Sequence, residues 1–127
     1  MLFLSRAEII ILHQRAINEH GGLDGIRDPG GLESAILAPQ MRRSYEDADL
    51  AQCAATYAFH LAKAHAFIDG NKRIAAAAAE TFLLLNGACL TASNDELYEC
   101  YVKIAAGELS RDEAEEMMRR WIAPCVQ

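Results

Sequence analysis

Hydrophobic side chains recur every three to four residues along most of the chain, which is the period of an amphipathic helix. The first such segment spans residues 7–20, and its apolar stripe consists of Ile9, Leu12, Ala16 and Ile17. Ser5 and Glu8 have the spacing of a capping box at its start, and Gly21-Gly22 ends it. The pattern therefore predicts an N-terminal helix.

Further segments follow the same pattern. We expect a short helix opened by Asp28-Pro29 and ending at about Ala38, before Pro39, and long helices over 50–64 and 71–86. Two more capping boxes, Ser93 with Glu96 and Ser110 with Glu113, open helices that end near Gly107 and Trp121. No strand-like alternation exceeds four residues. The prediction is an all-α fold of about six helices in a single domain, residues 1–127.

The segments between these helices differ in character. Residues 21–31 are too rich in glycine for regular structure, residues 40–49 read as a polar connector, and residues 68–70 must form a loop. The run Ala75 to Ala79 lets a neighbouring helix approach closely, which suits a central helix packed on several sides.

Composition and charge narrow the class of protein. The chain has 127 residues, of which 52% are hydrophobic, so it can bury a core without cross-links. Its net charge of −6 argues against direct binding of nucleic acid. The segment Met1–Arg6 turns polar too soon for a signal peptide, and the apolar run Ile74–Ala79 is too short to span a bilayer. We expect a soluble cytoplasmic protein without a membrane partner.

The cysteines are expected to be reduced. Cys53, Cys89, Cys100 and Cys125 are scattered and form no C-x-x-C pair. In a cytoplasmic chain such residues are usually buried thiols.

The segment between the two long helices carries the candidate chemistry. His65 ends one helix, Asp69 lies in the loop, and Gly70-Asn71-Lys72-Arg73 open the next helix. Unpaired N–H groups and partial positive charge at a helix N-terminus favour phosphate, and Lys72 and Arg73 add charge there. His65 is a candidate general base and Asp69 a candidate Mg²⁺ ligand, while Phe67 is expected to point inward.

Physics alone leaves two interpretations of this segment open. The residues form either a phosphoryl or nucleotidyl transfer site, or a structural turn in which His65 packs in the core and Lys72 and Arg73 are solvated. The segment is not a P-loop, since G-x-x-x-x-G-K-[ST] is absent.

A family resemblance favours the first interpretation. The motif HAFIDGNKR resembles the signature of the Fic/Doc (Fido) family, H-x-F-x-[DE]-G-N-x-R, at every fixed position. Upstream, HGGLDGIRDPGGLESAI is similar to the N-terminal region of the death-on-curing (Doc) branch, so the resemblance covers nearly the whole chain. It implies a compact helical bundle in which the motif joins two central antiparallel helices.

The resemblance also implies roles for the motif residues. His65 would deprotonate the hydroxyl of a target protein, and Asp69 would hold Mg²⁺ or position the target. Gly70, Asn71 and the first-turn N–H groups would bind the phosphates of ATP, with Lys72 beside them and Arg73 as an electrostatic clamp. The implied cofactors are ATP and Mg²⁺.

Two positions separate the branches of the family. AMP-transferring members carry a second glycine at the position of Lys72 and a second arginine at that of Ala76, so this chain resembles the kinase-like death-on-curing branch. That branch implies a toxin that phosphorylates a Ser or Thr hydroxyl of a translation factor such as elongation factor Tu and arrests growth. Because the chain keeps Gly70 where the best-known death-on-curing motif has alanine, AMP transfer stays an alternative, as does a non-catalytic binding protein.

Regulation and target docking are further expectations from the resemblance. The inhibitory motif [S/T]-x-x-x-E-[G/N] of many Fic enzymes is absent, which implies neutralisation by a separate Phd-like antitoxin. Arg42, Arg43 and Tyr45 are expected in a loop at the position of a target-docking flap. His60 and Trp121 are expected to be structural.

Overall fold

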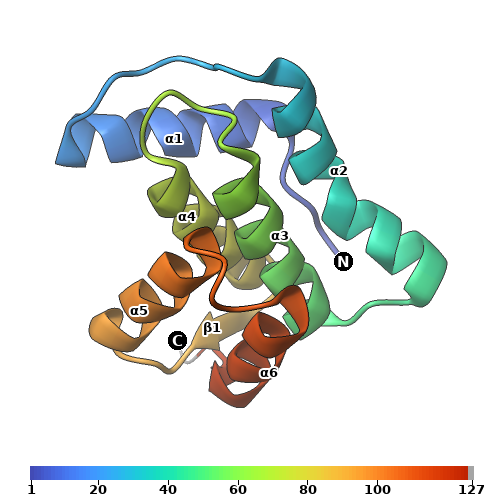
Figure 1. Ribbon diagram of the computed structural model, residues 1–127. Coiled ribbons are helices and arrows are strands. Elements are labelled where there is room, and N and C mark those ends of the chain that lie inside the picture. The colour runs from blue at the N-terminus through green and yellow to red at the C-terminus, as the bar shows by residue number, and fades with distance from the viewer. Residues whose placement is uncertain (126–127) are drawn as a thin grey trace.

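The computed structural model describes residues 1–125 and consists there of six helices and two short strands (Figure 1). The other four helices flank the pair formed by α3 and α4, which lie side by side and are joined by the loop 65–70. The elements are α1 (Arg6–His20), α2 (Pro29–Glu46), α3 (Leu50–Ala64), α4 (Asn71–Leu85), β1 (Ala88–Leu90), α5 (Asn94–Ala105), α6 (Arg111–Trp121) and β2 (Ile122–Pro124). The predicted all-α class and the central helix pair are confirmed.

Small side chains allow α3 and α4 to pack closely. Ala54, Ala58, Ala75 and Ala78 are wholly buried between the helices and their neighbours. Larger side chains fill the remaining core, and the rings of Tyr57 and Phe82 lie 5.2 Å apart between centroids. The close packing makes the central pair a rigid support for the loop at its end.

Side-chain caps explain where most helices begin. The capping boxes predicted at Ser5, Ser93 and Ser110 are present, and Asp28 caps α2. A further capping box, formed by Asp49 and Gln52, opens α3. Only α4 begins, among the helices of residues 1–125, without a side-chain hydrogen bond at its N-cap, Gly70.

The predicted end of the second helix at Ala38 is wrong, because α2 continues through Pro39 to Glu46. Proline removes one helical hydrogen bond, but tertiary packing outweighs that loss here. Pro39 is buried, and the buried Arg42 guanidinium donates to Thr56 Oγ1 at 2.9 Å and forms an ion pair with Glu115. Because of these contacts, residues 40–46, which were predicted to form a polar connector, are helical and pack against α3.

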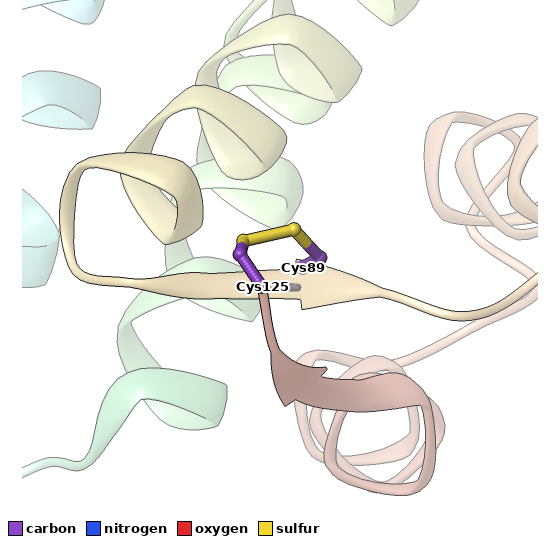
Figure 2. The surroundings of a disulfide bond; sticks show 2 residues. All are labelled: Cys89 and Cys125. Atoms are coloured by element: carbon purple, nitrogen blue, oxygen red, sulfur yellow. A yellow bond between two sulfur atoms is a disulfide. The ribbon is translucent and has the colours of Figure 1, made fainter. Parts of the chain in front are cut away.

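The expectation of four reduced cysteines is wrong for two of them. Cys89 is the middle residue of β1, and Cys125 comes directly after β2. The two cysteines form a disulfide across this antiparallel pair (Figure 2). Their separation of 36 residues gives no local sequence signal for the pairing. Cys53 and Cys100 are buried free thiols, and burial raises the pKa of each to about 11.

We expect reduction of the Cys89–Cys125 disulfide to lower the melting temperature by roughly 10 °C. A disulfide that closes a loop of this length raises the free energy of unfolding by about 2–4 kcal/mol, and reduction removes that contribution. Thermal unfolding followed by circular dichroism, with and without dithiothreitol, measures the shift. The Cys89→Ser variant is the control and should melt at the lower temperature in both buffers. Titration of four thiols in the unreduced, denatured protein would contradict the pairing.

Between residues 1 and 125, none of the helices combines the length and apolar character needed to cross a lipid bilayer.

Candidate active site

The loop 65–70 crosses one end of the central helix pair, next to α1 and the segment 21–28 (Figure 1). His65 is the C-cap of α3 and has a left-handed backbone with φ of 46°. Its side chain is exposed, whereas the next two residues, Ala66 and Phe67, are buried. The loop therefore presents His65 outward while anchoring itself in the core.

Backbone hydrogen bonds hold the loop against segment 21–28. The Ala66 carbonyl accepts from Arg27 N at 2.7 Å and from Asp28 N at 3.0 Å, and Ile68 N donates to the Gly25 carbonyl at 3.0 Å. This pairing resembles a short stretch of sheet. The glycine-rich segment predicted to be irregular thus acts as a brace for the loop.

Asn71 braces the loop from the other side. Its Oδ1 accepts from Phe67 N at 3.1 Å, and its Nδ2 donates to the Phe67 carbonyl at 3.0 Å. The side-chain amide is therefore engaged within the loop, and the backbone N–H is the group of Asn71 that remains for a phosphate.

Asp69 is anchored through both its backbone and its side chain. Its carbonyl lies 2.7 Å from His13 Nε2, and its Oδ2 accepts from Leu23 N at 2.7 Å. The other carboxylate oxygen, Oδ1, has no hydrogen-bond partner in the part of the chain described. One carboxylate fits Mg²⁺, which commonly takes few protein ligands and completes its shell with water and substrate phosphates. No cluster of three or more His, Cys, Asp or Glu side chains that could enclose a metal occurs in residues 1–125.

The start of α4 is suited to an anion. The first helical hydrogen bond there runs from Ile74 N to the Gly70 carbonyl, so the preceding N–H groups of residues 71–73 lack helical acceptors. The side chains of Lys72 and Arg73 are exposed on the same turn. Backbone donors, helix dipole and two cations together favour phosphate at this point.

Two neighbouring hollows share this turn. One, of about 410 Å³, is lined by parts of α3 and α5 and by six residues of the motif: His65, Ile68, Asp69, Gly70, Asn71 and Lys72. The other, of about 300 Å³, lies between α4 and α5 and is lined by Arg73, Glu80 and Tyr101 among others. Lys72 and Val102 border both hollows. The structure thus gathers most of the predicted site residues in one hollow and places Arg73 in the next.

Sequence reasoning missed the polar floor of the second hollow. Burial raises the pKa of Glu80, and Tyr101 Oη lies 3.5 Å from its Oε2. Burial, followed by the Glu80 charge, also raises the pKa of Tyr101. The available signal was a single carboxylate directly after an alanine run, on a helix otherwise apolar at that point.

The other residues singled out in the sequence lie away from the motif. Arg42, Arg43 and Tyr45 belong to α2 and not to a loop, so the predicted flap is wrong for these residues. His60 lines a separate hollow with Ser110 to Asp112, and burial lowers its pKa. Trp121 packs against the core as expected.

Comparison with known proteins identifies the family of the chain. Residues 3–83 match the model of the Fic/DOC family. The chain is 40% identical over 121 residues to the protein of Escherichia phage P1 named "Protein kinase doc", covering 94% of this chain and 95% of that protein. It is also 40% identical over 95 residues to "Toxin Doc" of Mycolicibacterium smegmatis, covering 73% and 71% of the two chains.

Proposed function

This chain belongs to the Fic/DOC family and to its Doc branch, and on that premise we propose that it is a toxin with protein kinase activity. One structural observation carries the proposal: the exposed His65 side chain lines the same hollow as the uncapped N-terminus of α4 and Lys72. A general base and a phosphate-binding helix end are the two parts that transfer to a hydroxyl requires.

The reaction follows from the placement of these groups. His65 accepts the proton of a target Ser or Thr hydroxyl, and the hydroxyl oxygen forms a bond to the γ-phosphorus of ATP. The bond from that phosphorus to the β–γ bridging oxygen breaks, ADP leaves, and His65 returns its proton to solvent. The first-turn N–H groups, Lys72 and Arg73 bind the phosphates and stabilise their charge. Asp69 would hold Mg²⁺, which neutralises phosphate charge when bound.

The close packing of α1 against Gly70 weakens the case for AMP transfer. A Cβ at this position would lie 3.3 Å from both His13 Nε2 and Ile17 Cδ1, so it would meet α1. Gly70 is required by its φ of 80° and by this close approach, and its presence is not itself a sign of a more open phosphate site. Lys72, which distinguishes the branches, remains beside the helix end.

The partners follow from the same premise. The target is a cytoplasmic translation factor of the elongation factor Tu type, whose phosphorylation arrests growth, and a separate Phd-like antitoxin neutralises the protein. The relative from Mycolicibacterium smegmatis carries the name of a toxin, which supports neutralisation by an antitoxin.

Labelled ATP tests the proposed reaction. Purified protein is incubated with Mg²⁺, cell extract and ATP labelled at either the α- or the γ-phosphate. We expect protein-bound label from the γ position only. Label from the α position would establish AMP transfer, and absence of label from both would leave a non-catalytic binding protein.

A further inference from the structure

His13 lies on the inward face of α1 and is the one histidine that is wholly buried in residues 1–125. It occupies the apolar stripe between Ile9 and Ile17, where a hydrophobic side chain would leave no polar atom in need of a partner. Burial of an imidazole is unfavourable unless its polar atoms find partners. The contacts of this ring therefore indicate what it does.

The ring contacts two residues of the motif loop and lies close to a third. Its Nε2 lies 2.7 Å from the Asp69 carbonyl oxygen, and its plane stacks on Phe67 with centroids 3.7 Å apart and a 12° tilt. The Gly70 Cα approaches so closely that an added Cβ would lie 3.3 Å from Nε2. Because a carbonyl only accepts, Nε2 carries the hydrogen whatever the charge of the ring.

The other ring nitrogen faces segment 21–28. His13 Nδ1 is buried without a hydrogen-bond partner in the described part of the chain, and Asp24 Oδ1 lies 3.5 Å away. The same segment binds the loop through Leu23 N and the Gly25 carbonyl. His13 thus sits where α1, the loop and this segment meet.

We propose that His13 is a positioning residue that fixes the Asp69–Gly70 peptide and thereby the geometry between His65 and the N-terminus of α4. His13 lines neither hollow, so it acts through the loop. Without its N–H, the Asp69 carbonyl loses its donor, and the next residue, Gly70, is the N-cap from which the phosphate-binding turn begins. The effect on catalysis rests on the proposed function, whereas the effect on the loop does not.

A matched pair of variants separates the hydrogen bond from the packing. His13→Phe retains an aromatic ring of similar size against Phe67 but removes the donor, and His13→Gln removes the ring but retains a donor able to reach a carbonyl. Initial rates of label transfer from γ-labelled ATP to extract proteins, at varied ATP, give apparent kcat and KM. Thermal unfolding shows whether each variant folds.

We expect His13→Phe to lower kcat about 10- to 100-fold with the KM for ATP changed less than about threefold, because small misplacement of reacting groups affects chemistry more than binding. His13→Gln should restore kcat to within about fivefold of the parent protein, since it restores the donor. Equal losses in both variants, tracking their melting temperatures, would show a merely structural role and overturn the proposal.

Amide hydrogen exchange tests the loop without reference to activity. In His13→Phe, the amides of Phe67 and Ile68 should exchange at least about tenfold faster, while Ala106 N in the α5 cap should be unchanged. Unchanged loop exchange would overturn the positioning role. If the parent protein transfers no label but the exchange rates change as expected, the proposed kinase function fails and the positioning of the loop by His13 stands.

Discussion

Replacing His65 with alanine is expected to lower kcat for protein phosphorylation by about 10²- to 10⁴-fold, which is the usual contribution of a general base. The side chain is exposed and lines the motif hollow, and none of the hydrogen bonds within residues 1–125 involves it. Its removal should therefore leave the fold intact. Label transfer from γ-labelled ATP measures the loss, and growth of cells expressing each form measures toxicity.

Two further variants isolate the role of the imidazole. His65→Asn keeps a residue that tolerates the left-handed backbone at φ 46°, so it separates loss of the base from backbone strain. His60→Ala removes a histidine five residues earlier, within α3, that lines a different hollow, and it should keep nearly full activity. If His65→Ala is as toxic and as active as the parent protein, the proposal that this site is catalytic is wrong.

Local signals were enough to predict most helices. The capping boxes at Ser5, Ser93 and Ser110 are short-range patterns whose hydrogen bonds form within one turn, and each helix begins where they predict. The continuation of α2 past Pro39 depends instead on Arg42 reaching Thr56 and Glu115. Such contacts join residues far apart in the sequence, so no local pattern contains them.

The disulfide and the small sheet also depend on contacts between residues far apart in the sequence. β1 and β2 are three residues each, too short for an alternating pattern, and their pairing becomes possible only when α5 and α6 fold back between them. Cys89 and Cys125 meet as a consequence of that pairing.

The motif could be predicted as a set of residues but not as a geometry. The sequence placed a base, a carboxylate and a helix N-terminus next to one another. It gave no sign that the Asn71 amide closes the loop, or that Asp69 uses one oxygen to bind Leu23 N. The support from His13 was hidden because a histidine in an apolar stripe has no motif around it. Placement of a loop depends on its neighbours in space, which only the fold defines.

The second large effect is expected at Arg73. The guanidinium is exposed beside Lys72, lines the hollow between α4 and α5, and has no ion-pair partner within residues 1–125. A cation free of protein partners next to unpaired helix N–H groups is placed to stabilise phosphate charge in the transition state. Removing one such donor typically costs about 10²- to 10³-fold in rate. We expect Arg73→Ala to lower kcat/KM by that factor.

Arg120→Ala is the matched control, because it makes the same change in net charge on the exposed face of α6 and should alter transfer less than about twofold. Lys72→Ala should give a smaller loss than Arg73→Ala, since a lysine acts on phosphate as a point charge whereas the arginine fork binds two oxygens. Label transfer at several ATP concentrations distinguishes these cases. If Arg73→Ala behaves like Arg120→Ala, the phosphates are held by the backbone of α4 and Lys72 alone, and the hollow between α4 and α5 is not part of the site.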